Sequence, residues 1–257
     1  MIAVQTIAPR VTNRLRTFNA VAGLVHLLQA IAVLFLTNDF SIPVTAVFME
    51  GPPGTDATKV TTLFDFRIGW GVAVFLLMSA TAHLVLITPG VFQWYVRQLE
   101  TRRNYARWIE YSLSSSLMVV LIALLPGITD ISALIALFGV NAAMILFGLL
   151  MEKYEQPGNP SWTSYWFGVL AGSVPWIAIA FYLWTPGSIA NPPIFVYVIF
   201  VSLFLFFNSF SLNMILQYRQ TWRWRNYLYG EYVYILLSLT AKSMLAWQIF
   251  AGTLAAD

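Results

Sequence analysis

The stretch that decides the fold lies near the C-terminus, where residues 228–250 read LYGEYVYILLSLTAKSMLAWQIF. About 20 mostly apolar residues in a helix cross the hydrocarbon core of a bilayer, so this run predicts a membrane-spanning helix. Lys242 lies in the middle of the run. A charged group in hydrocarbon costs about 2.5–3.5 kcal/mol on insertion scales, so an amine at this depth needs a physical reason.

The composition of the whole chain also indicates a membrane protein. Of its 257 residues, 59% are hydrophobic and only 10% are charged, whereas soluble domains have about 45–50% apolar and about 25% charged residues. This excludes a disordered regulator, a small secreted scaffold and a nucleic-acid binder that works through basic patches. The chain has no cysteine, which excludes disulfides, thiolate metal sites and cysteine nucleophiles.

Six further segments have the length and polarity of membrane-spanning helices. Proline and glycine, which stop helices or tolerate the turns that follow them, lie between most of the segments. The sequence therefore predicts an all-α membrane protein, a seven-transmembrane helical bundle that forms a single domain over residues 1–257. The expected spans are approximately 18–36, 66–88, 105–126, 132–151, 163–184, 193–217 and 228–250.

The connector over residues 37–65 differs from the others because it is long and alternates in polarity. Its alternation and the turn sequence after it predict a β-hairpin in the first extracellular loop, although a plain surface loop is an alternative. An apolar strand outside the membrane needs cover, so we expect the hairpin to serve a homodimer contact. The alternating residues are Phe40, Ile42, Val44, Ala46 and Phe48, and the turn is Gly51-Pro52-Pro53-Gly54.

Basic residues cluster in the connectors on the N-terminal side of the predicted bundle. Because basic short loops stay in the cytoplasm, we expect a multi-pass protein of the cell membrane with a cytoplasmic N-terminus and an extracellular C-terminus. This face would meet membrane lipid or an unidentified cytoplasmic signalling partner. The basic residues are Arg10, Arg14, Arg16, Arg97, Arg102, Arg103, Lys153, Arg219, Arg223 and Arg225, and the opposite side has Lys59 with Asp39, Glu50, Asp56, Asp130 and Asp257.

The acid best placed to pair with Lys242 is Glu110 in the third predicted span. Helical side chains lean towards the N-terminus and each residue advances about 1.5 Å, so the two head groups agree in depth. A desolvated lysine attacks aldehydes as a neutral amine, and an adjacent carboxylate stabilises the cationic imine. Two alternatives stay open: Lys242 only holds helices together by an ion pair, or Glu110 lies near the headgroups and pairs with Arg103 or Arg107.

Aromatic residues are dense around these two groups and could form the walls of a slot for an elongated apolar ligand. Any one of them is more often a packing or interface residue, so only their combination with a buried lysine favours a pocket. They are Trp108, Tyr111, Trp176, Tyr182, Phe206, Phe207, Phe210 and Tyr234.

Two histidines, His26 in the first span and His83 in the second, lie at similar depth in the inner half of the predicted bundle. They are either hydrogen-bonded packing residues or a water-bridged site that stores a proton. Gln29 and Asn141 are plausible polar neighbours. Two histidines without a third protein ligand argue against a metal site.

A seven-helix protein with a lysine in its last span and a cytoplasmic N-terminus resembles the heliorhodopsins over essentially the whole chain. The long first extracellular loop, the glutamate of the third helix and Ser-Leu-Thr-Ala-Lys at residues 238–242 carry the resemblance. It implies all-trans-retinal on Lys242 as a protonated Schiff base, with Glu110 as its counterion and Ser238 beside it. It also implies a homodimer, a slow photocycle and, in most members, no ion transport. We expect the cofactor to be bordered by Trp108, Tyr111, Ser115, Asn141, Trp176 and Phe206, and a polar cavity to be formed by His26, His83, Ser79 and Gln29.

The residues themselves argue for a light sensor and against a pump. Pumps that resemble bacteriorhodopsin have an aspartate one turn before the lysine and a second carboxylate on helix three. Here Ser238 takes the first place, and only serines follow Glu110 as polar groups, which cannot hold a negative charge at neutral pH. Glu152 and Glu231 are expected at helix ends, paired with arginines.

Two other functions remain as alternatives. The first is a light-driven ion transporter or channel on the same scaffold. The second is a transporter or membrane enzyme without a chromophore, in which Lys242 and Glu110 bind substrate. The chain has no HExxH, GxSxG or lysine-containing phosphate loop, so we expect no enzymatic activity.

Overall fold

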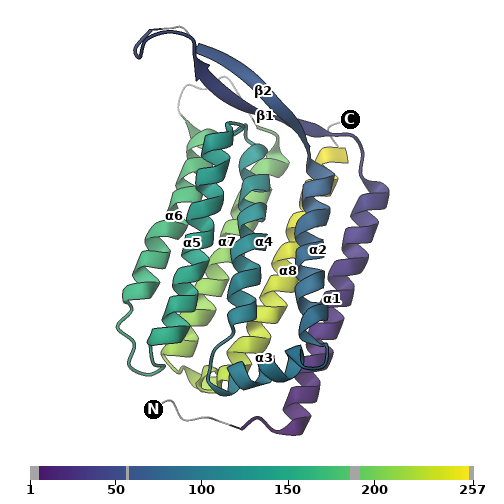
Figure 1. Cartoon of the computed structure of the whole chain (residues 1–257), viewed down its shortest axis with the longest axis vertical. Helices are drawn as coiled ribbons and strands as arrows, with labels where there is room; N and C mark the ends of the chain where they lie inside the picture. Colours follow the sequence, from purple (N-terminus) through teal and green to yellow (C-terminus); the bar gives the residue numbers. More distant parts are fainter. Residues whose placement is uncertain (1–5, 56–57, 186–191, 255–257) are drawn as a thin grey trace.

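The computed structural model describes residues 6–55, 58–185 and 192–254. Within these residues, seven helices are long and apolar enough to cross a membrane, and they form one bundle (Figure 1). The predicted fold class is therefore confirmed, and the chain is a multi-pass membrane protein. The spanning helices are α1 (Pro9–Leu36), α2 (Ile68–Leu86), α4 (Tyr105–Leu124), α5 (Ile131–Tyr154), α6 (Thr163–Trp184), α7 (Ile194–Tyr218) and α8 (Tyr227–Leu254).

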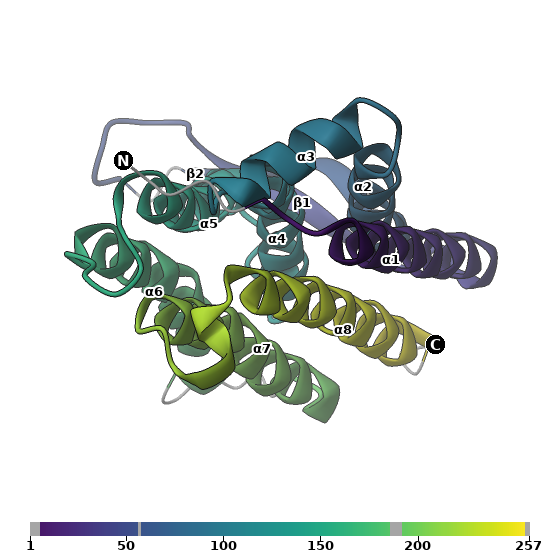
Figure 2. The same ribbon diagram turned by 90° about the horizontal axis from the view of Figure 1, so that it is seen from below.

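The helices follow one another around the bundle, as the view along its axis shows (Figure 2). α1 packs against α2 and α8, α4 packs against α2 and α5, and α7 packs against α8. The largest buried cluster combines residues from α1, α2 and α4 to α8 in the half of the bundle nearer the hairpin, and separate clusters lie towards the other end. The expected spans agree with the helices within a few residues except at α1. This helix begins at Pro9, because proline is well suited to a first helical turn, where its missing N–H would have no partner.

A short helix, α3 (Val91–Glu100), lies across the N-terminal end of the bundle (Figures 1 and 2). Sequence reasoning treated this segment as a plain connector. Tyr95 and Leu99, four residues apart on one face, pack into a buried cluster with Leu15 and Leu86. Burial also raises the pKa of the Tyr95 phenol well above its ordinary value. α3 thus closes this end of the bundle.

The connector between α1 and α2 forms the predicted hairpin at the other end of the bundle (Figure 1). β1 (Ser41–Met49) pairs antiparallel with β2 (Thr58–Arg67), and the register shifts between Val44 and Thr45. The side chain of Val44 is buried, and the Thr45 amide donates to the Thr129 carbonyl at 2.9 Å. Beyond this anchor, the strands project away from the bundle, and Phe48 is half exposed.

Candidate functional site

Lys242, Glu110 and Ser79 meet in the middle of the bundle, one each from α8, α4 and α2. The Lys242 Nζ lies 2.6 Å from Glu110 Oε1 and 2.6 Å from Ser79 Oγ. The Ser79 hydroxyl also donates to Glu110 Oε1 at 2.7 Å. Lys242 is 3% exposed and Ser79 is fully buried, so water does not screen this ion pair. The depth match expected from the sequence is thus present, and Glu110 pairs with Lys242 and not with Arg103 or Arg107.

A cavity of about 320 Å³ begins at Lys242 and passes between α4, α5, α6, α7 and α8. Its surface is mostly apolar, which suits an elongated hydrocarbon ligand. Gly148, on α5, permits the Trp108 ring to lie close, because a Cβ there would stand 2.4 Å from that ring. Of the residues expected around a cofactor, the cavity is bordered by Trp108, Tyr111, Ser115, Trp176, Ser238 and Lys242.

Three expected neighbours of the cavity lie elsewhere. Phe206 does not border it, because the cavity-facing side of α7 presents Phe207 and Phe210 instead. Tyr182 is half exposed on α6, beyond the lining. Asn141 is buried behind Ser115, which does border the cavity. Its side-chain amide donates to Ser115 and Ser116 of α4, at 2.9 and 3.1 Å, and not to a histidine.

The two histidines lie side by side, as their equal depth predicts. The His26 and His83 rings are stacked with centroids 6.0 Å apart. His83 Nδ1 is 2.8 Å from Asn19 Oδ1, a partner that sequence reasoning missed, whereas neither ring nitrogen of His26 has a partner among the described residues. Gln29 donates to Ser243, the residue after Lys242, and not to a histidine. The described residues contain no group of three side chains suited to a metal.

The Heliorhodopsin family model matches residues 15–254, which is most of the chain. The chain belongs to the heliorhodopsin family. It is therefore a retinal-binding, light-responsive rhodopsin, and this family is not a classical enzyme family. None of the curated proteins matches the sequence. Among solved structures, cyanorhodopsin from the cyanobacterium Tolypothrix sp. NIES-4075 is 14% identical, with a TM-score of 0.56 over 95% of both chains. At that identity the likeness concerns the fold.

The cavity of this heliorhodopsin has the chemistry that retinal requires. Its inner end presents the Lys242 amine, the group that combines with an aldehyde, and the acid Glu110 lies beside that amine. The Ser238 hydroxyl is buried one helical turn before Lys242 and has no hydrogen-bond partner among the described residues. This hydroxyl borders the same cavity as the Lys242 amine.

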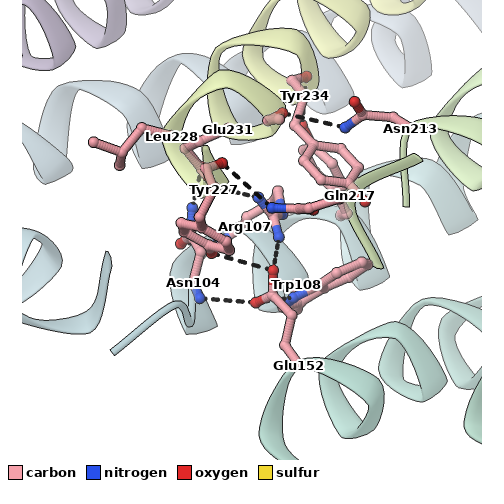
Figure 3. A network of polar contacts seen from close by, with 12 residues as sticks. Asn104, Arg107, Trp108, Glu152, Asn213, Gln217, Tyr227, Leu228, Glu231 and Tyr234 are labelled. Atoms are coloured by element: carbon pink, nitrogen blue, oxygen red, sulfur yellow. Dashed lines mark hydrogen bonds and ion pairs between the residues drawn. The ribbon is translucent and has the colours of Figure 1, made fainter. Parts of the chain in front are cut away.

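A second polar cluster lies between Lys242 and the N-terminal end of the bundle (Figure 3). Arg107 of α4 is buried and contacts both Glu152 of α5 and Glu231 of α8. The two acids lie near helix ends and pair with an arginine, as expected, and the structure adds that they are buried, at 5% and 1% exposed. The cluster touches the apolar cavity, because Trp108 borders that cavity and donates its indole N–H to Glu152 at 2.7 Å.

Proposed function

We propose that this heliorhodopsin is a light sensor in which all-trans-retinal is bound through the Lys242 nitrogen and Glu110 is the counterion. The observation that carries the proposal is the buried contact between Lys242 and Glu110, at the inner end of an apolar cavity. When bound, retinal would supply the light-absorbing polyene and would be held through the Lys242 nitrogen, with its aldehyde oxygen released as water. Side chains of the protein compensate the charge on the nitrogen and couple it to the helices.

Glu110 has two tasks in this arrangement. Its carboxylate compensates a positive charge on the Lys242 nitrogen, because an opposite charge at close range favours the charged form. Through Ser79 it also ties α4 to α2, since the Ser79 hydroxyl contacts both the acid and the amine. A change in the position of the charged nitrogen therefore acts on three helices at once. The apolar cavity walls exclude water and strengthen these electrostatic interactions.

The distribution of acids supports a sensor and not a pump. The only acidic residues within the described spans are Glu110, Glu152 and Glu231. The last two form the cluster between the retinal site and the N-terminal end, so no span carboxylate lies between Lys242 and the hairpin end. A carboxylate relay across the membrane is therefore missing. Three of the serines after Glu110 donate to backbone carbonyls of their own helix; these are Ser112, Ser115 and Ser116.

The test compares photochemistry with transport in sealed vesicles that contain the retinal-loaded protein. We expect a flash to produce a slow, reversible absorbance change, while steady illumination produces no change in pH or membrane voltage. A light-driven pH change abolished by a protonophore would instead establish the second candidate, an ion transporter, which only the versatility of the scaffold favours.

Charge at the two ends supports a cytoplasmic N-terminus. The N-terminal end presents exposed arginines, among them Arg10, Arg219 and Arg223, whereas Arg67 at the hairpin end is paired with Asp39 at 3.3 Å. Basic residues favour the cytoplasmic side. Protease added to intact cells should cleave a tag after residue 257 and spare one before residue 1. The reverse pattern would contradict this orientation.

The outer hairpin supports a homodimer. Its projecting part exposes apolar side chains, including Phe48, Val60 and Phe64. Exposed apolar surface of this kind marks association sites, and a second copy would cover it. Phe48→Ser with Val60→Ser should convert dimer to monomer in detergent, whereas Leu170→Ser on the lipid-exposed side of α6 should not. The basic face remains available to anionic lipid and to a signalling partner.

A further inference from the structure

The two acids that contact Arg107 differ in how many donors they face. One oxygen of Glu152 accepts from the Arg107 guanidinium and from the Tyr227 hydroxyl. The other oxygen accepts from the backbone N–H of Asn104 and from the Trp108 indole N–H. Four donors fill the four lone-pair sites of an ionised carboxylate. Hydrogen bonds of this kind favour the charged form. Glu152 is therefore the anion that balances Arg107.

Glu231 faces only two donors, the Arg107 guanidinium on one oxygen and the Asn104 side-chain amide on the other (Figure 3). The single positive charge of Arg107 is already balanced by Glu152. A second buried anion beside Glu152 would be uncompensated, and like charges that share a site disfavour ionisation. A proton on Glu231 removes this charge and still leaves both contacts possible, because a carboxyl oxygen accepts in either state.

Glu231 borders a small cavity of about 30 Å³, into which a protonated carboxyl group can direct its O–H. The cavity is also bordered by Arg107, Asn19 and His83, and it reaches Glu110. Its volume is about that of one water molecule, and several polar side chains border it. The buried Nε of Arg107 has no partner among the described residues. The cavity therefore offers water a place next to both Glu231 and the counterion. Other ionisable groups within electrostatic reach of Glu231 are Tyr95, Tyr111, Tyr227 and Tyr234.

We propose that Glu231 is a second proton-binding acid of this protein, neutral in the dark, and that it is linked to Glu110 through the small cavity that both residues border. The proton resides on a Glu231 oxygen and exchanges through water in the cavity. Glu152 keeps its negative charge as the partner of Arg107. The protein thus has a proton site beside the retinal site, on its N-terminal side.

The first test uses infrared spectroscopy of the protein without retinal, at neutral pH. The carbonyl stretch of a protonated carboxyl group should be present in the parent and absent in Glu231→Gln. The matched control Glu155→Gln replaces an acid at the same end of the bundle that hydrogen-bonds Ser161 at the surface, and the band should persist there. A parent spectrum without this band, or a band that Glu231→Gln leaves intact, would overturn the proposal.

Thermal unfolding gives a second measurement. Glu231→Gln resembles the neutral acid and should lower the melting temperature less than Glu152→Gln, which leaves Arg107 without its anion and sets an amide N–H₂ against donors. The opposite ranking would overturn the assignment. If Glu152→Gln does not fold, the infrared spectrum of Glu231→Gln alone decides whether Glu231 carries the proton.

The link to Glu110 is tested with retinal bound, and this part rests on the proposed function. Illumination should shift the frequency of the Glu231 band, and an unshifted band in a protein that shows a photocycle would refute the link. The dark measurement needs no retinal, so its failure is distinct from a failure of the light-sensing proposal.

Discussion

The Nζ atom of Lys242 lies 2.6 Å from Oε1 of Glu110, although 132 positions separate the two residues in the chain. They belong to α8 and α4, and Ser79 of α2 contacts both. The buried amine and the buried acid thus balance each other, which is the condition under which both can remain inside a membrane protein.

Removal of the negative charge at Glu110 should change the colour of the retinal-loaded protein. Glu110→Gln keeps the shape of the side chain but loses the charge that stabilises the cationic nitrogen in the dark. The visible band should therefore move to longer wavelength in an absorption spectrum. Glu155→Gln, at the surface, should leave the band in place. A Glu110→Gln spectrum that matches the parent would show that Glu110 is not the counterion.

A bulky residue in the cavity should block retinal without unfolding the bundle. Gly168 borders the cavity, and a Cβ there would stand at an ordinary 3.4 Å from Phe147. Gly168→Phe should reduce the amount of bound retinal several-fold in a titration that follows the visible band. The control is Gly139→Phe, because Gly139 on α5 faces open space. Equal retinal binding by both variants would argue that retinal does not occupy this cavity.

The histidine pair should influence the photocycle more than the dark spectrum. His26 is buried next to His83, and its two ring nitrogens have no partner in the part of the chain that the structure describes, so the pair is suited to bind water or a proton. The double variant His26→Ala with His83→Ala should change the rate at which absorbance recovers after a flash. Recovery kinetics identical to those of the parent would favour the alternative that both residues only pack.

The helix α3 should contribute to stability through Tyr95. This side chain is 1% exposed, and replacement of a buried aromatic residue by alanine costs about 3–5 kcal/mol. Tyr95→Ala should therefore lower the melting temperature of the protein without retinal, whereas Gln93→Ala, on the exposed side of α3, should not. Similar melting curves would mean that α3 is only loosely attached.

Much of this fold was predictable because hydrocarbon imposes strong rules on a sequence. A spanning helix must be long and apolar, so the seven spans and the depth match between Lys242 and Glu110 followed from simple counting. The hairpin followed from its alternation. α3 was missed because it has only ten residues and lies at the bundle end, where length and hydropathy give no signal. The sequence feature that indicates this helix is the four-residue spacing of Tyr95 and Leu99, which places both on one helix face.

The details of the site were less predictable, because they depend on the rotation of each helix about its axis. Phe206 and Phe207 are neighbours in sequence, yet only Phe207 borders the cavity. The pairing of Glu152 and Glu231 with an arginine was predicted, but the burial of their cluster around Arg107 was not, for a related reason. Glu152 and Glu231 lie close to helix ends in the sequence, where acids are usually solvated, and only the packing of α4, α5 and α8 reveals that both are buried.

The most direct measurement of the central claim is an absorption spectrum recorded after all-trans-retinal is added to membranes that contain the protein. The account predicts a visible band in the parent and in Lys59→Ala, which alters a surface lysine of the hairpin. It predicts no such band in Lys242→Ala, provided that this variant is folded by circular dichroism. A parent without the band, or a folded Lys242→Ala variant that acquires the same band, would contradict the account.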